Sequence, residues 1–347
     1  GVETAGFAAT AFTITAILTR PFAGYYVNIK RKKTILSAAL AVISVSILGY
    51  AICHHIVPIL LFRLLHGVGW GMVTTSSSTV AVASLPEEKI GSGIGLFGIA
   101  SSLASVFAPN LGLQLIALSN YSTMFLISFA LAALGCALSL LIEEKTLRRA
   151  EARPEKGRVI DRFFAKEAAV PAFTILCVGL GMATISNFIV LYAEELRVGN
   201  IGYYFTVAGA VMLVMRPLFG RLSDSKYKQG IVFVALFGYI SVFAALGLAK
   251  TLPGFLLAAV LYGTFYGALC PIVQTWCVKA VDAAKSGTAN STYYTALDVG
   301  QGLGASLGGI ISARFSYSNM YFFMILPQIC AILLIVMSSI SSKKRIN

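Results

Sequence analysis

The chain has 347 residues, of which 57% are hydrophobic and only 12% are charged, and its mean hydropathy is +0.82. These values exceed what a soluble domain needs to fill its core, so they exclude a soluble globular protein. A net charge of +13 is typical of a nucleic-acid-binding protein, but the basic residues are concentrated in alternate loops between apolar segments. No nucleic-acid partner is needed to explain that pattern.

Eleven nearly uncharged segments follow one another along the chain. At 1.5 Å per residue, a segment of about 20 residues crosses a hydrocarbon core of about 30 Å as an α-helix. The segments do not alternate apolar and polar residues, which argues against a membrane β-barrel. We therefore expect an all-α polytopic membrane protein, with helices at residues 5–27, 34–53, 56–80, 91–117, 121–142, 168–193, 201–222, 230–249, 253–277, 287–311 and 320–340.

The loops that alternate with these segments carry 21 of the 27 lysine and arginine residues on one side. The positive-inside rule predicts that this side, with the C-terminus, is cytoplasmic, in what we expect to be a bacterial plasma membrane. We divide the chain into an N-terminal helix bundle (1–142), a cytoplasmic linker (143–167) and a C-terminal helix bundle (168–347). The six cysteines show no metal-ligand spacing, so neither a metal site nor a cofactor is expected.

The two halves of the chain repeat each other at a constant offset of 196 residues. Residues 20–24 (RPFAG) match residues 216–220 (RPLFG), and the same offset aligns Gly91 with Gly287 without a gap. The helix at 168–193 has no counterpart in the first half. We interpret the chain as two six-helix bundles from which the first helix is missing. Parallel repeats of this kind are related by a pseudo-two-fold axis along the membrane normal.

The end of the first predicted helix and the loop after it contain Gly24, Asn28 and the basic residue Arg31, and the second half has Gly220 and Asp224 at positions equivalent to the first two. This pattern resembles the signature loop of the major facilitator superfamily, and the whole chain resembles its twelve-helix drug:proton antiporters and related exporters. The first half departs from the family pattern, which has an aspartate and a glycine at positions 28 and 31. The resemblance implies that these five residues form conformational-switch loops that latch one half against the other. Membrane anchoring by the basic cluster is the alternative interpretation.

Arg63 and the spaced glycines after it resemble a family motif that is associated with proton coupling. A guanidinium keeps its charge, so within lipid it needs a partner or a water-filled cavity, unless it extends outward to the interface. Residues 104–112 resemble a degenerate form of the antiporter motif that the family associates with export. They favour outward transport.

Asp298 is the one acidic residue in the middle of an apolar segment. It lies roughly 18 Å deep, counted at 1.5 Å per residue, where an ionised carboxylate costs at least about 2.5 kcal/mol. Low dielectric favours the protonated group and a nearby cation favours the ionised one, so a proton and a substrate can compete there. We predict that Asp298, with Arg63, carries proton coupling. The alternative is a structural aspartate that caps a helix break or bonds to a neighbouring helix.

Polar and aromatic side chains on several predicted helices are candidates for a substrate cavity: His66, Trp70, Asn187, Gln274, Asn290, Tyr294 and Gln301. The last three share a helix face with Asp298. Glycines at 300, 304 and 308 form a separate stripe that we expect to pack against a neighbouring helix. Packing or local hydrogen bonding is the alternative role for each polar candidate.

The resemblance implies a secondary active transporter with a major-facilitator-like fold that works by alternating access, as a monomer in the lipid bilayer and without enzymatic activity. We expect proton-coupled efflux of a small organic solute, drug or metallophore-like compound. Two alternatives stay open. One is uptake or facilitated transport of a sugar or organic anion, with Arg63 binding the negative charge, and the other is a non-transporting membrane receptor. The sequence contains no nucleotide-binding loop and no nucleophile–base pair that would indicate a pump or a hydrolase.

Overall fold

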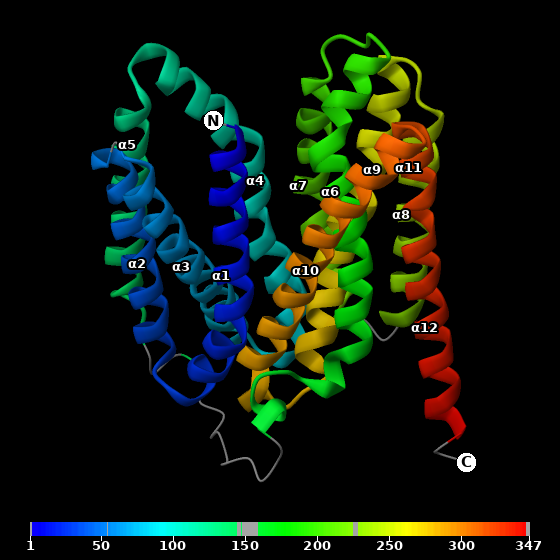
Figure 1. Ribbon diagram of the computed structural model, residues 1–347. Helices are drawn as coiled ribbons and strands as arrows, with labels where there is room; N and C mark the ends of the chain where they lie inside the picture. Colours follow the sequence, from blue (N-terminus) through cyan, green and yellow to red (C-terminus); the bar gives the residue numbers. More distant parts are fainter. Residues whose placement is uncertain (1, 54, 144–146, 148–158, 225–227, 345–347) are drawn as a thin grey trace. The chain divides into compact units, whose positions relative to one another are not determined.

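The computed structural model describes residues 2–53, 55–143, 147, 159–224 and 228–344 (Figure 1). Over these residues the regular structure is entirely helical. Hydrocarbon offers no hydrogen-bond partner to the backbone, and an α-helix satisfies its own N–H and C=O groups along its length. The predicted fold class is therefore confirmed for the described part of the chain.

The α-helices have these bounds, in chain order: α1 (Val2–Ile29), α2 (Lys32–Ile52), α3 (Ile56–Ala83), α4 (Ile90–Leu118), α5 (Tyr121–Ser139), α6 (Ala169–Glu195), α7 (Gly202–Leu222), α8 (Lys228–Leu248), α9 (Leu252–Lys279), α10 (Ser286–Arg314), α11 (Tyr317–Phe323) and α12 (Ile325–Lys344). Short 3₁₀ helices join some of them: η1 (Glu87–Lys89), η3 (Val159–Arg162), η4 (Lys166–Ala168) and η5 (Ala283–Lys285). By length and hydropathy, eight of the described helical segments suffice to cross a membrane.

The last predicted helix differs from the observed structure. It begins at Tyr317, three residues before the predicted start, because the Ser316 hydroxyl accepts a hydrogen bond from the Asn319 N–H at 3.1 Å and caps the helix. The chain then leaves the helix at Met324 and resumes it as α12. Pro327 lies just beyond this break. Its backbone nitrogen carries no hydrogen, so it cannot donate a hydrogen bond to the carbonyl oxygen of Phe323. The single predicted segment is thus two helices.

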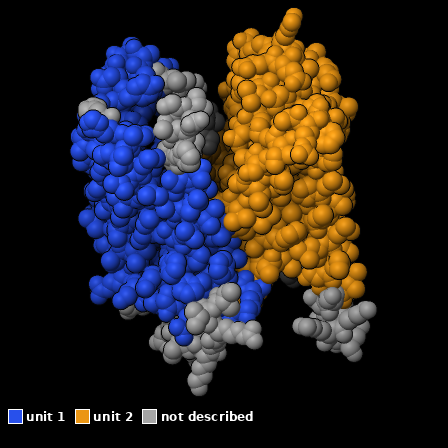
Figure 2. Space-filling model, viewed as in Figure 1, with its two compact units in different colours: residues 1–86, 107–166, 278–295 blue, residues 87–106, 167–277, 296–347 orange. Residues whose placement is uncertain are grey.

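The chain forms two compact units (Figure 2). Unit 1 consists of residues 1–86, 107–166 and 278–295, and unit 2 consists of residues 87–106, 167–277 and 296–347. Helices α4 and α10 are therefore each divided between the units. The predicted bundles, 1–142 and 168–347, follow chain order and stay a prediction. Residues 144–146 and 148–158 of the predicted linker lie outside the described residues.

Within unit 2, α10 packs closely against α6. A Cβ atom on Gly300 would collide with the carbonyl oxygen of Leu176, and one on Gly304 with that of Leu180. A Cβ atom on Gly308 would lie 2.8 Å from Cε2 of Phe188. The absence of side chains at these positions lets the two helices approach each other. The expected packing role of this glycine stripe is confirmed.

Replacing Gly304 by alanine should lower the thermal unfolding midpoint of the purified protein in detergent. The added methyl group must displace α6 backbone, which costs about 1–3 kcal/mol. Gly302 is a matched control on the same helix, because a Cβ atom there meets nothing within 4 Å. Gly302→Ala should leave the midpoint unchanged or raise it, since alanine favours a helix by about 1 kcal/mol over glycine. Equal midpoints for the two variants would contradict the packing assignment.

Candidate functional site

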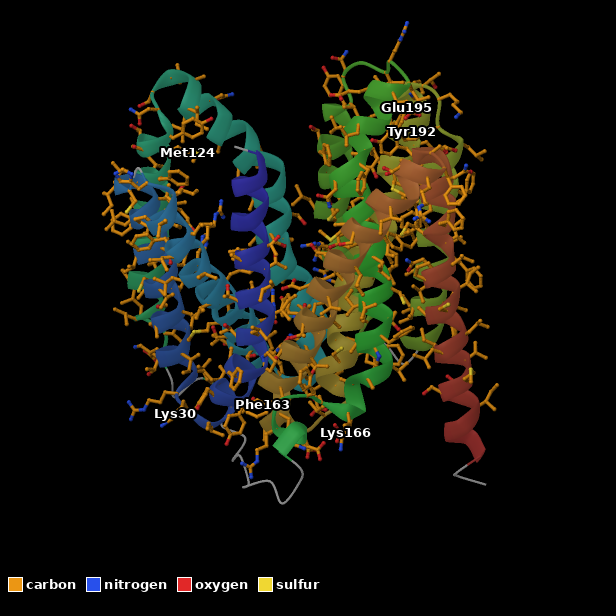
Figure 3. All side chains as sticks on the ribbon, viewed as in Figure 1. Lys30, Met124, Phe163, Lys166, Tyr192 and Glu195 are labelled. Carbon is orange, nitrogen blue, oxygen red and sulfur yellow. The ribbon has the colours of Figure 1, made fainter. Side chains whose placement is uncertain are left out.

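The end of α1 and the start of α10 are joined in unit 1 by the side chain of Asn28 (Figure 3 draws the side chains as sticks on the ribbon). Its Oδ1 accepts a hydrogen bond from the Gly287 N–H at 2.8 Å, and its Nδ2 donates to Thr288 Oγ1 at 2.9 Å. The first N–H groups of a helix have no partner within the helix, so Asn28 acts as a cap supplied by another element. Gly24 permits this approach, because a Cβ atom there would lie 2.8 Å from Gly287 O.

The end of α7 and the start of α4 are joined in unit 2 in the same way by Asp224. Its carboxylate accepts hydrogen bonds from the N–H of Gly91, the N–H of Ser92 and the hydroxyl of Ser92, each at 2.8 Å. A Cβ atom on Gly220 would lie 2.8 Å from Gly91 O. A negative charge is favoured at a helix N-terminus by the aligned peptide dipoles as well as by these bonds.

We call these two contacts the helix-end latches. The offset of 196 residues relates them, since it places Asn28 on Asp224 and Gly287 on Gly91. Four of the five residues predicted for switch loops therefore take part in repeat-related contacts. The fifth, Arg31, is exposed and precedes α2, where its side chain makes no capping hydrogen bond. The two latches differ chemically, because one uses a neutral amide and the other a carboxylate.

Two buried arginines at equivalent positions of the two repeats, Arg20 and Arg216, lie about two helical turns before the latch residues Asn28 and Asp224. Arg20 is 1% exposed, and its Nη1 donates to Thr74 Oγ1 on α3 at 2.8 Å. Its guanidinium carbon lies 5.0 Å from the centre of the Tyr294 ring on α10. A cation over a tyrosine ring in a desolvated site is attracted to the ring face. Arg20 thus ties α1 to both α3 and α10 within unit 1.

Arg216 occupies the equivalent position in unit 2. It is 9% exposed, and its Nη1 donates to the carbonyl oxygen of Gly98 and to Ser101 Oγ, the latter at 2.6 Å, both on α4. Its Nε is buried without a hydrogen-bond partner in the described part of the chain. A charged residue at matching places in two apolar segments was the signal in the sequence that would have singled out this pair.

Arg63, His66 and Trp70 lie together along α3 in unit 1. The guanidinium carbon of Arg63 is 5.1 Å from the centre of the Tyr50 ring, and Tyr50 Oη is 3.2 Å from His66 Nδ1. The Phe12 ring of α1 packs edge-on against His66 with centroids 5.3 Å apart, and it lies 6.3 Å from the Trp70 ring. The three predicted residues therefore form one group, whose roles in coupling and substrate binding stay predictions.

Asn290 and Tyr294, which we placed on a cavity-facing surface of α10, make packing contacts here. Asn290 is fully buried, and its Oδ1 accepts a hydrogen bond from Ser78 Oγ on α3 at 2.9 Å. Its Nδ2 donates to Thr79 Oγ1 and to Ser286 O. Tyr294 lies under Arg20. In this structure both residues hold α10 against its neighbours in unit 1, and a cavity role for them stays a prediction.

The other candidates belong to unit 2. Asp298 and Gln301 are partly exposed on α10, and Gln274 is buried on α9. Asn187 is exposed on α6, where its Nδ2 donates to Ala183 O of its own helix at 2.8 Å. These positions leave Asp298 as an ionisable group in the middle of a long helix, as expected from the sequence. Its role in coupling stays a prediction.

The sequence profile of the Major Facilitator Superfamily matches residues 1–305 and also residues 172–345. The chain belongs to the major facilitator superfamily. It is 26% identical to the multidrug resistance protein MdtG of Proteus mirabilis, over 90% of this chain and 81% of that protein. It is 23% identical to the staphyloferrin B transporter of Staphylococcus aureus, over 97% of this chain and 84% of that protein. The crystal structure of the human organic anion transporter MFSD10 shares the fold, with a TM-score of 0.81 and 15% identity over 95% of this chain and 83% of that one.

Membership of the major facilitator superfamily decides the broad class of this protein. Members of this superfamily are multi-span membrane transporters of small molecules and are not enzymes. The second profile match, which begins at residue 172, covers the second of the two repeats. The family assignment and the repeat-related latches therefore describe the same duplicated architecture.

Removing the carboxylate of Asp224 should destabilise the protein. Asp224→Ala leaves the N–H groups of Gly91 and Ser92 without their acceptor, at a cost of about 1–3 kcal/mol, and Asp224→Asn should cost less because one oxygen remains. The measurement is the thermal unfolding midpoint in detergent. Asp282→Asn is a matched control, because the Asp282 side chain precedes η5 without a capping hydrogen bond. If Asp224→Ala unfolds at the same temperature as the control, the latch contributes nothing.

The contact between Arg20 and Tyr294 should contribute to the thermal stability of the protein. Tyr294→Leu removes the ring and should lower the unfolding midpoint, because cation–π contacts contribute about 0.5–2 kcal/mol. Tyr294→Phe keeps the ring face and is the matched variant. It should unfold at a temperature well above that of Tyr294→Leu. Equal losses for the two variants would show that the hydroxyl, which both lack, and not the ring, stabilises this site.

Proposed function

We propose that this protein is a secondary active transporter that exports a small organic solute, drug or metallophore-like compound in exchange for protons. The observation that carries the proposal is the position of Asp298, a partly exposed carboxyl group in the middle of α10. The similarity to a multidrug resistance protein and to the staphyloferrin B transporter supports a solute of this kind.

Asp298 has the properties that a proton carrier needs. In a low-dielectric surrounding the protonated carboxyl group is favoured, and an approaching cation or polar solute favours the ionised form. Its neighbours on α10 at 297, 300, 301 and 304 pack against or beside α6, so the group stands on a helix that is held firmly on one side. A change in the protonation of Asp298 therefore acts on a helix whose first turn is held by the Asn28 latch.

The helix-end latches suit a protein that alternates between two states. Each latch consists of two or three hydrogen bonds at one helix terminus. Such a bond contributes about 0.5–1.5 kcal/mol between neutral groups and about 1.5–3 kcal/mol when a charge is involved. A contact of that strength can bias a conformational equilibrium without locking it. The neutral Asn28 and the charged Asp224 give the two latches unequal strength, so we infer that they bias the two ends of the transport cycle differently.

The test begins with a thermal-shift screen of the purified protein against cationic drugs, sugars and metal-chelating amino acids. A solute that stabilises the protein is then offered to inverted membrane vesicles whose interior is acidified. Wild-type vesicles should accumulate the solute, and collapse of the pH gradient should release it. Asp298→Asn should lower the gradient-driven accumulation at least tenfold, because the amide cannot carry a proton.

Asp282→Asn, which changes an exposed acidic residue outside the helices, is the control for this experiment and should accumulate the solute normally. Accumulation that persists in the Asp298→Asn variant, or after collapse of the pH gradient, would end the antiport proposal. Facilitated passage of a sugar or an organic anion is then favoured, with Arg63 as the candidate cation that binds it.

A further inference from the structure

The two repeat-related arginines have different surroundings. The Arg20 guanidinium lies against the ring of Tyr294, and the residue that matches Tyr294 in the other repeat is Gly98. At the position that matches Tyr294, Arg216 therefore meets a glycine, which offers no ring. A Cβ atom on Gly98 would lie 3.0 Å from Nη1 and 3.1 Å from Cδ of Arg216, so the arginine rests directly on the α4 backbone.

Arg216 is a buried cation with incomplete hydrogen bonding. A guanidinium offers five N–H donors and keeps its charge at any physiological pH. In the part of the chain that the structure describes, only Nη1 donates to a partner, Nε is buried without one, and no carboxylate forms an ion pair with the group. A buried charge without a counter-charge is destabilising, and an anionic ligand would offset this cost.

The geometry points to Arg216 as the residue that binds the anionic group of the transported solute. The site consists of Arg216 on α7 with Ser101 on α4, whose exposed hydroxyl already contacts Nη1. A carboxylate is the ligand that suits it, because its two oxygens match the fork formed by the guanidinium N–H groups. This inference rests on the proposed transport function and narrows its substrates to solutes that carry a carboxylate. Metal-chelating compounds fit this class, since carboxylate oxygens are common metal ligands.

The position of Arg216 separates this role from proton coupling. Arg216 lies on α7 and Asp298 on α10, so a substitution at one leaves the other side chain in place. Arg63, the cation named for an organic anion in the alternative function, belongs to unit 1 and Arg216 to unit 2. Substrate preference and gradient dependence can therefore be measured as independent properties.

The experiment compares a rhodamine dye that has a free carboxyl group with its methyl ester, two probes that differ only in the carboxylate. Binding to the purified protein is measured by fluorescence polarisation, and transport is measured in inverted vesicles. The readout is the ratio between acid and ester within each variant, which does not depend on the amount of protein. Wild type should prefer the acid. Arg216→Gln should lower this ratio roughly tenfold to a hundredfold, as expected for the loss of a charged hydrogen bond.

Three further variants make the test specific. Arg216→Lys keeps the charge without the fork and should lose part of the preference. Gly98→Ala keeps the arginine, displaces its head group by steric contact and should also reduce the preference while the protein stays folded. Arg314→Gln removes an exposed arginine at the end of α10 and should keep the wild-type ratio.

The outcomes distinguish this inference from the proposed function. If the acid binds in an Arg216-dependent way but neither dye accumulates in vesicles, the anion site stands and the export proposal fails for these solutes. If wild type binds the acid no better than the ester, or if Arg216→Gln keeps the wild-type ratio, the anion site is rejected whether or not the dyes are transported.

Discussion

The first N–H groups of α4 and α10 lack partners within their own helices, and in both cases a side chain from the end of another helix supplies the acceptor. Asp224 does so for α4 and Asn28 for α10. Each of these helices begins in one compact unit and ends in the other. A helix start inside a membrane protein cannot rely on bulk water, so a side-chain acceptor at this point determines where the chain can turn.

The duplicated backbone carries different chemistry in its two copies. The offset of 196 residues relates Asn28 to Asp224, and it also relates Tyr294 to Gly98. In the first pair both side chains accept from backbone N–H groups at a helix start, and an amide is exchanged for a carboxylate. In the second pair Arg20 contacts the Tyr294 ring, whereas Arg216 donates to the Gly98 carbonyl oxygen. A duplicated scaffold needs its close helix contacts in both copies for stability, whereas a transport site needs its charges in only one place. The differences between matched residues are therefore better guides to function than the matches.

Helix positions could be predicted to within a few residues because a long apolar segment is a local property of the sequence. The exception was the last segment, where the cap at Ser316 moves the helix start and the break before Pro327 divides one apolar run into two helices. The switch-loop residues were found through their motif and its repetition. Their hydrogen-bond partners at Gly287 and Gly91 were not, because contacts between residues far apart in sequence depend on how the helices pack.

The sequence by itself determined the fold class, the family and the duplicated organisation, since these depend on hydrophobicity, spacing and repetition. Only the tertiary structure decided what covers each polar face. Asn290 and Asp298 share one face of α10, yet Asn290 is buried against α3 and Asp298 is partly exposed. Likewise, Arg20 and Arg216 match in sequence, and among the described residues only Arg20 has its guanidinium over an aromatic ring. Periodicity shows which residues lie on the same side of a helix, but the neighbouring helices determine which of them remain accessible.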